Sequence, residues 1–381
     1  MMQRGFEPRE FEQRTQAAQR MMQAAGLDAL LLSTEADVRY FTGYLTRFWE
    51  SPSRPWFVVV PAQGKPVAVI PSIGAALMAQ TWVDDIRTWR APDPADDGVS
   101  LLADTLNGLG ARTIGTPMGY ESHLRMPLAD WARVQAALRG VVRDDAGIVA
   151  RLRSVKSAAE VAKITQACAI AGRAFARVPQ IARVGVPLSQ VFRDFQRLCL
   201  EEGADWVPYL AGGAAQGGYG DVISPASDAP LVAGDVLMLD TGLVWDGYFC
   251  DFDRNFSLGP SDAQTEAAHA RLIEAVDAAA HIARPGATAA QLFHAMDAIV
   301  TGGKGGSDAG RLGHGLGMQL TEGLSLIPQD HTVLEPGMVI TLEPGIETGE
   351  GRMLVHEEDI LITEGAAVFL SPRSGPAMVQ L

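Results

Sequence analysis

The hydrophobic pattern of the first 150 residues alternates between helical and strand-like stretches. Helix-forming residues run from Pro8 to Ala25 and stop at Gly26, which predicts a helix with a glycine C-cap. Strand-like apolar runs follow at 29–32, 56–60, 67–70 and 113–115, with a helical stretch near 101–109. The pattern breaks around 145–155, so we expect a small α/β domain over residues 1–150.

The remaining residues, 151–381, combine long helical patterns with strand-like runs. We expect helices at about 158–178, 187–203, 262–283 and 289–301. Three of these open on a hydroxyl residue followed three positions later by Glu or Gln, which is typical of a capping box: Ser157 with Glu160, Ser261 with Gln264, and Thr288 with Gln291. Helices laid over one curved antiparallel sheet give an α+β class.

Acids interrupt the strand-like runs of this second domain. The Asp-Gly pair at 246–247 predicts a tight hairpin between two such runs. With those residues as the turn, Asp240 faces Asp253 across the hairpin. Asp251 lies two residues before Asp253, so all three carboxylates project from one side of the sheet.

Close carboxylates raise each other's pKa and resist burial, so this arrangement is stable mainly around a cation. Two divalent ions would balance four acids, while a histidine adds a neutral nitrogen: Asp240, Asp251, Glu343, Glu357 and His314. Oxygen-rich ligands with one imidazole suit Mn, Co, Fe or Zn. We therefore expect two divalent metal ions, with Mn favoured, and a site that activates water.

The order of these motifs resembles the pita-bread superfamily of prolidase, aminopeptidase P, methionine aminopeptidase and creatinase. The matching features are an Asp, a second Asp eleven positions on, then "GHG", "LEPG" and a Glu before a final apolar strand. "GLDALLLSTEADVRYFTGY" resembles the creatinase-type amino-terminal domain, and "RLRSVKSAAEVAKITQACAIAGRAF" resembles the opening of the catalytic domain. The resemblance implies a pita-bread carboxy-terminal domain behind a creatinase-like one.

The resemblance also implies a role for each metal-binding position. Asp240 would bind one metal, Asp251 and Glu357 would bridge both, and His314 and Glu343 would hold the other. Glu343 would also serve as general base. Glu358 competes with its neighbour for the last ligand position, but the family's six-residue spacing to a strand-ending Thr selects Glu357.

The chain departs from the Xaa-Pro peptidase pattern at groups that handle protons and substrate. Thr321 stands where a second His is usual, the segment "GGYGDVISPASDAP" upstream of the first Asp contains no His, and Val355 and Asp253 replace an Arg and a Thr. The expected function is a dinuclear-metal hydrolase, similar to Xaa-Pro dipeptidases and aminopeptidases. The alternatives are a creatinase-like C–N hydrolase or lyase on a small molecule, and a binding module without catalysis, which the intact ligand set opposes.

His356 adjoins Glu357 and is a candidate to replace the missing histidines if the backbone curls inward. Strand alternation instead points it away from the metal side, as an ordinary buried His. Thr321 and Asp253 are further candidates for contact with the substrate or with the metal ligands.

The segment 44–57 concentrates aromatic residues and arginines, including Arg47, Trp49 and Arg54. Such clusters occur at interfaces and substrate lids, and also in ordinary cores. In the resembled family this domain often reaches the neighbouring subunit's active site. The resemblance therefore implies a homodimer, and the hypothesis is that Arg47, Trp49 or Arg54 touches substrate there.

Composition narrows the partners and the compartment. A net charge of −14 argues against nucleic acid and anionic membranes as partners. The resemblance implies a small peptide or small-molecule substrate. The three cysteines have no paired short spacing, and the amino terminus is too polar for a signal peptide. No run reaches the roughly 18–20 apolar residues of a membrane helix. We expect a cytoplasmic protein.

Overall fold

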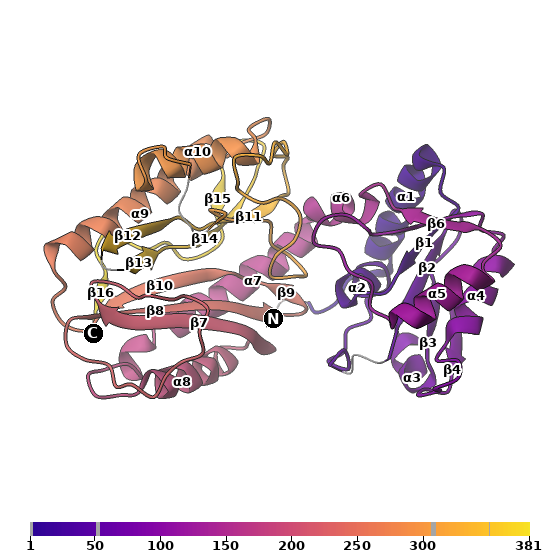
Figure 1. The fold of residues 1–381 in the computed structure, drawn as a ribbon, viewed down its shortest axis with the longest axis horizontal. Coiled ribbons are helices and arrows are strands. Elements are labelled where there is room, and N and C mark those ends of the chain that lie inside the picture. The colour runs from indigo at the N-terminus through magenta and orange to yellow at the C-terminus, as the bar shows by residue number, and fades with distance from the viewer. Residues whose placement is uncertain (1–2, 51–53, 306–309, 350) are drawn as a thin grey trace. The chain divides into compact units, whose positions relative to one another are not determined.

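The computed structural model describes residues 3–50, 54–305, 310–349 and 351–381, shown as a ribbon in Figure 1. The chain divides into two compact units, residues 1–152 and 153–381. None of the helices in the described ranges is long and apolar enough to cross a membrane.

The first unit is built on a mixed six-stranded sheet with the order β4-β3-β2-β1-β5-β6. Its elements in chain order are α1 (Pro8–Ala25), β1 (Ala29–Leu32), α2 (Glu35–Thr42), β2 (Phe57–Pro61), β3 (Val67–Pro71), the short 3-10 helix η1 (Ser72–Gly74), α3 (Ala75–Met78), β4 (Asp85–Trp89), α4 (Val99–Gly108), β5 (Thr113–Thr116), α5 (Leu128–Ala137) and β6 (Val141–Asp144). The expected α/β character of this region is confirmed.

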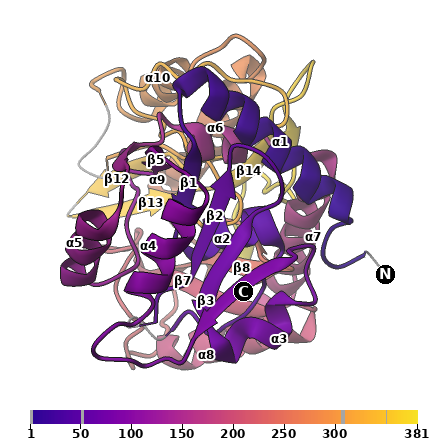
Figure 2. The same ribbon diagram turned by 90° about the vertical axis from the view of Figure 1, so that its right-hand side faces the viewer.

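Helices cover both faces of this sheet, which is why its central strands are apolar without alternation. Leu31 and Val59 pack in one core with Leu102 of α4 and Val134 of α5. Figure 2 shows α1 on the opposite side of the sheet from α4 and α5. The helix predicted over residues 8–25 has the predicted bounds and ends at Gly26, whose φ of 65° is the left-handed conformation of a glycine cap.

The second unit contains the remaining elements after α6 (Ile148–Ser154), which joins the two units. They are α7 (Ala158–Phe175), η2 (Val178–Gln180), α8 (Leu188–Glu201), β7 (Trp206–Gln216), β8 (Asp235–Trp245), β9 (Tyr248–Phe249), β10 (Phe252–Ser257), α9 (Ala263–Ile282), α10 (Ala289–Val300), β11 (Val339–Leu342), β12 (Gly345–Gly349), β13 (Arg352–Val355), β14 (Glu358–Leu361), β15 (Val368–Phe369) and β16 (Val379–Gln380).

The strands of this unit form three hydrogen-bonded groups. One has the order β16-β10-β8-β7 with β9 paired to β8, the second is β11-β14-β15, and the third is β12-β13. Every pair is antiparallel except β10 with β16. In Figure 1, α7 and α8 lie on the side of β7 and β8, whereas α9 and α10 lie on the side of β11 to β14. The α+β class is confirmed.

Two of the three predicted capping boxes are present, at Ser157 and at Thr288. The prediction at Ser261 is wrong, because Asp262 caps α9 by accepting a hydrogen bond from the backbone N–H of Thr265. An ionised aspartate one position later accepts that bond with a full negative charge, and Ser261 instead donates its hydroxyl proton to Glu266.

The hairpin has the register that its turn predicts. Asp246 and Gly247 have φ values of 49° and 80°, the positive values that a two-residue turn requires. Asp240 faces Asp253. The second run is not one continuous strand, since it is interrupted between β9 and β10, and Asp251 lies in that interruption.

Candidate metal centre

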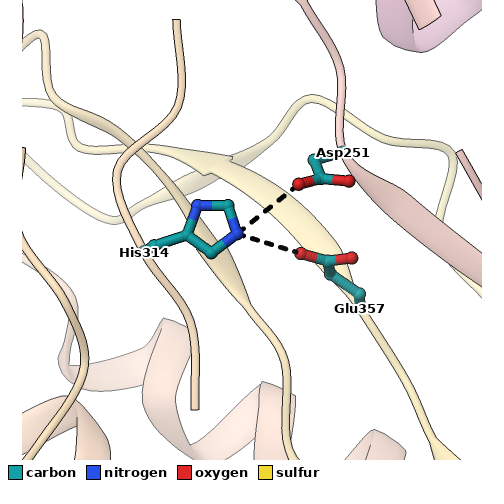
Figure 3. A group of neighbouring side chains, drawn as sticks. All are labelled: Asp251, His314 and Glu357. Atoms are coloured by element: carbon teal, nitrogen blue, oxygen red, sulfur yellow. Dashed lines mark ion pairs between the residues drawn. The ribbon is translucent and has the colours of Figure 1, made fainter. Parts of the chain in front are cut away.

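Three side chains from distant parts of the second unit converge at one point. Asp251, His314 and Glu357 each present one ligand atom, and these atoms all lie within 4.8 Å of one another. The Nε2 atom of His314 is 3.4 Å from Oδ2 of Asp251 and 4.0 Å from Oε1 of Glu357. Figure 3 shows the imidazole edge directed at both carboxylates.

Backbone hydrogen bonds fix His314 beside β11. Its N–H donates to Oγ1 of Thr341 at 3.2 Å, and its carbonyl accepts from the N–H of Thr341 at 2.7 Å. The Nδ1 atom lies 3.0 Å from the carbonyl oxygen of Gly315, which can only accept, so Nδ1 carries the proton. Nε2 therefore presents its lone pair to the acids, as a metal-binding histidine does.

Burial and the nearby Arg311 guanidinium lower the pKa of His314 to about 4. The ring is therefore neutral at physiological pH, which is the form that binds metals.

The two candidate glutamates, Glu343 and Glu357, lie just beyond the paired ends of strands β11 and β14. Leu342, the last residue of β11, is paired with Glu358, the first residue of β14, so Glu343 and Glu357 are the next residues outward on the two chains. The N–H of Glu343 donates to the carbonyl of Leu312 at 2.9 Å, which ties it to the segment that carries His314. Glu343 is half-buried, whereas Glu357 is 2% exposed.

Asp240, the remaining candidate ligand, lies on the central strand β8. Val236 and Met238 pack in the core with α9 and α10, and strand alternation places Asp240 on the same face. Asp240 is 8% exposed, and the nearby Tyr209 hydroxyl of β7 opposes the rise that burial causes in its pKa.

Mutual repulsion and burial act on all four acids. Burial first, and then the neighbouring carboxylates, raise the pKa values of Asp240, Asp251 and Glu357 well above the usual range. Burial raises the pKa of Glu343 to about 7, although Arg311 opposes the change. Ionised acids at these positions need positive charge among them.

Three of the candidate acids have a carboxylate oxygen that fits a bound cation. Among the residues that the structure describes, Oδ1 of Asp240, Oδ1 of Asp251 and Oε1 of Glu357 are buried without a hydrogen-bond partner. Buried carboxylate oxygens normally have partners, and metal coordination satisfies them where hydrogen bonds do not. Three unpaired oxygens and one free imidazole nitrogen are a donor set for a divalent transition metal.

Glu358, the alternative to Glu357, has a different environment. Its carboxylate contacts Arg254 at 3.0 Å and His356 at 3.2 Å, and it accepts a hydrogen bond from the Ser371 hydroxyl. Although burial raises its pKa, Arg254 and the hydrogen bonds lower it to about 2. Glu358 is thus neutralised by its own partners and is turned away from the centre.

The His356 side chain is buried between two acids, Asp253 and Glu358. Nδ1 is 3.2 Å from Oδ1 of Asp253, Nε2 is 3.2 Å from Oε1 of Glu358, and the side chain is 1% exposed. It touches the centre only indirectly, because Asp253 also accepts the N–H of Glu357 at 2.9 Å.

Thr321 accepts a hydrogen bond from the Arg311 guanidinium at 2.9 Å. Arg311 and Tyr209 both act on the acids electrostatically or by hydrogen bonding, and the sequence analysis missed them. The signal for Arg311 is its position three residues before His314 in a glycine-rich segment. Tyr209 has no local motif, and only the pairing of β7 with β8 brings it to Asp240.

The other three candidates belong to the first unit. Trp49 is 9% exposed and packs against Trp56 with ring centroids 5.9 Å apart, with the Arg125 guanidinium over its face. Arg47 is exposed and pairs with Glu50 at 3.1 Å. Arg54 lies over the Phe48 ring at 5.3 Å. Residues 51–53 of the same segment lie outside the described ranges.

Comparison with protein families gives two matches that together span most of the chain. The model described as "Creatinase/Prolidase N-terminal domain" matches residues 14–155. The model described as "Metallopeptidase family M24" matches residues 162–364, which include all five proposed metal-binding positions.

Individual relatives agree with these matches. A "Probable dipeptidase PepE" of Mycobacterium tuberculosis is 30% identical over 370 residues, covering 96% of this chain and 95% of that protein. The crystal structure of dipeptidase PepE from Mycobacterium ulcerans superposes with a TM-score of 0.85 at 28% identity, over 99% of this chain and 100% of that one. An Xaa-Pro dipeptidase from Bacillus anthracis shares the fold, with a TM-score of 0.84 at 20% identity over 97% and 100% of the two chains.

Proposed function

The chain belongs to metallopeptidase family M24 and is a metal-dependent peptidase, and we propose that it is a dinuclear-metal dipeptidase whose first substrate class is Xaa-Pro dipeptides. The observation that carries this proposal is the convergence of Asp251, His314 and Glu357 with unpaired ligand atoms. The two PepE relatives, a probable dipeptidase of Mycobacterium tuberculosis and a dipeptidase of Mycobacterium ulcerans, support a dipeptidase over a peptidase of long chains.

The proposed ligands are the five residues predicted from the sequence. Asp251 and Glu357 both approach His314 Nε2. In this proposal they would be shared by the two ions, His314 and Glu343 would hold one ion, and Asp240 would hold the other. Four carboxylates balance two divalent cations, which removes the repulsion that raises the acids' pKa values. Mn²⁺ is the proposed ion, because oxygen-rich sites with one imidazole suit it.

Glu343 is the proposed general base. Glu343 is half-buried, whereas Asp251 and Glu357 are 3% and 2% exposed. Of these three acids, Glu343 is therefore the most accessible to a water molecule. Divalent ions bound here would lower the pKa of water and polarise the scissile carbonyl. Glu343 accepts the proton of the attacking water and returns it to the leaving amine.

Arg311 and Tyr209 act on the acids of this site, which lacks the second histidine of Xaa-Pro peptidases. Arg311 is a fixed positive charge that opposes the rise in the pKa of Glu343, and its bond to Thr321 orients it. Tyr209 lies near Asp240 and opposes the rise that burial causes in the pKa of that carboxyl, which favours its ionised form. The prolyl-recognising groups of Xaa-Pro peptidases are replaced here, so the substrate test needs dipeptides without proline as well.

The test is a metal analysis of the purified protein followed by a substrate panel with MnCl₂. Ala-Pro, Ala-Ala, the tripeptide Ala-Pro-Ala and creatine separate an Xaa-Pro dipeptidase, a general dipeptidase, an aminopeptidase and a C–N hydrolase. We expect hydrolysis of Ala-Pro that EDTA abolishes and Mn²⁺ restores. Metal-independent cleavage would contradict the proposal, and turnover of creatine alone would replace it with the C–N hydrolase.

We also propose a cytoplasmic homodimer. The three cysteines, all buried as free thiols, support a reducing compartment. Arg47, which is 54% exposed at its side chain, is the residue of its cluster most available to a partner subunit or its substrate. Equilibrium sedimentation of the wild-type protein tests the assembly, and a monomer would contradict it. Unchanged turnover and dimerisation in Arg47→Ala, Trp49→Ala and Arg54→Ala would remove these residues from the substrate site and the interface.

A further inference from the structure

A buried chain of hydrogen bonds lies directly beneath the proposed bridging acid Glu357. Oδ1 of Asp253 accepts the backbone N–H of Glu357 at 2.9 Å and lies 3.2 Å from Nδ1 of His356. The other ring nitrogen of His356 is 3.2 Å from Oε1 of Glu358. Asp253, His356 and Glu358 are each 1% exposed.

Glu358, at the far end of this series of hydrogen bonds, is held by several further contacts. Glu358 contacts the Arg254 guanidinium at 3.0 Å, the hydroxyl of Ser371, and the N–H of Ser374 at 3.1 Å. Arg254 also donates to the carbonyl of Glu357 at 3.2 Å. The peptide groups on both sides of Glu357 are therefore held by side chains, the N–H by Asp253 and the carbonyl by Arg254.

Glu357 is not itself part of a paired β-strand. Glu357 lies between β13, which ends at Val355, and β14, which begins at Glu358. Its N–H depends on the Asp253 carboxylate. A shift of Asp253 would thus move the Glu357 carboxylate relative to His314, and His356 is the side chain that fixes Asp253 from behind.

We propose that Asp253 and His356 are a positioning pair that sets the place of the Glu357 carboxylate and so controls the affinity of the centre for its metal ions. The inference rests on the proposed metal centre. Neither residue touches the substrate; the pair acts through Glu357. Partners behind a metal ligand typically change metal affinity by about 10 to 100-fold when they are removed.

The test is isothermal titration of EDTA-stripped protein with MnCl₂. His356→Leu removes both ring contacts, and we expect Mn²⁺ affinity to fall by about 10 to 100-fold. His356→Asn keeps a donor near the Nδ1 position, and we expect it to restore most of that loss. The matched control is His269→Leu, a buried histidine whose ring lies 6.0 Å from that of His356 but whose Nδ1 has no hydrogen-bond partner in the described structure.

A second pair of variants covers the case in which His356→Leu fails to fold. Asp253→Val and Asp253→Asn both remove one negative charge, but only Asn keeps an oxygen that can accept the Glu357 N–H. The difference between them therefore reports the hydrogen bond alone. We expect the Val variant to bind Mn²⁺ about tenfold more weakly than the Asn variant.

The outcomes separate the two proposals. Wild-type affinity in His356→Leu, or equal affinities in the two Asp253 variants, would overturn the positioning role and leave the metal centre intact. A wild-type protein that binds no Mn²⁺ would overturn both. A loss in His269→Leu as large as that in His356→Leu would also overturn the inference, because general core damage would then explain the result.

Discussion

The Nε2 atom of His314 lies 3.4 Å from Oδ2 of Asp251, while its Nδ1 atom is already bonded to the carbonyl of Gly315. The imidazole is thus oriented and its tautomer is fixed before any ion binds. We predict that His314→Ala loses one metal equivalent per chain and at least about 100-fold in kcat/KM, since loss of a ligand should exceed loss of a ligand's partner.

Metal content by plasma mass spectrometry and turnover of the best dipeptide check this prediction. His294→Ala is the control, because that histidine is exposed on α10. Full metal content in His314→Ala would remove His314 from the ligand set.

Glu343 combines the roles of proposed ligand and base, and a substitution can separate them. Glu343→Gln keeps a carbonyl oxygen for coordination but removes the group that accepts a proton. We predict a fall in kcat of about 10² to 10⁴-fold with KM little changed. Steady-state kinetics at saturating Mn²⁺ measure both parameters, and near-normal kcat would assign the base to another residue.

The sequence predicted the local parts of this site well. The Asp-Gly turn at 246–247 fixes the pairing of Asp240 with Asp253, because hairpin register follows from turn geometry. The approach of His314 to Glu357 joins distant segments, and only the resemblance of the motifs pointed to it. The ligand set could therefore be proposed in advance, although no local rule brings its members together.

The contacts that fix other side chains near the site had no local signal in the sequence. His356 is fixed by Glu358, and Glu358 in turn by Ser371 and Ser374 in the carboxy-terminal tail. Where that tail packs depends on the whole unit and not on the neighbouring sequence. Tyr209 was missed for the same reason, since its place beside Asp240 comes from the pairing of β7 with β8.

Removal of metal should make stability depend on pH. Burial raises the folded-state pKa of Glu343 to about 7 from a usual 4.5, and the pKa values of Asp251 and Glu357 also rise. Between pH 4.5 and 7 the folded state binds more protons than the unfolded state, so stability falls as pH rises. We predict that the Tm of EDTA-treated protein decreases from pH 5 to pH 8.

Saturating Mn²⁺ should abolish most of that decrease, because the cations replace the protons among the acids. Differential scanning calorimetry with and without Mn²⁺ measures the effect. A Tm of the metal-free protein that is flat or rises over this range would contradict the repulsion inferred for the site.

A second buried acid should show the opposite dependence. Glu322 contacts Lys156 at 3.0 Å and also pairs with Arg153, and its side chain is 7% exposed. Although burial raises its pKa, the two cations lower it to about 2. We predict that Glu322→Gln destabilises the protein by about 3 to 5 kcal/mol near pH 7, since it removes the negative charge that both buried cations contact.

The pH dependence follows from the same pKa. The unfolded carboxyl, at about 4.5, binds its proton before the folded one at about 2, so the contribution of Glu322 is complete above pH 5 and lost as pH falls toward 2. The difference in Tm between wild type and Glu322→Gln should therefore shrink in acid. Glu201→Gln is the control, because that exposed acid pairs with Arg177 at the surface and should have no measurable effect. A difference that stays constant from pH 7 to pH 3 would show that Glu322 contributes through packing and not through its charge.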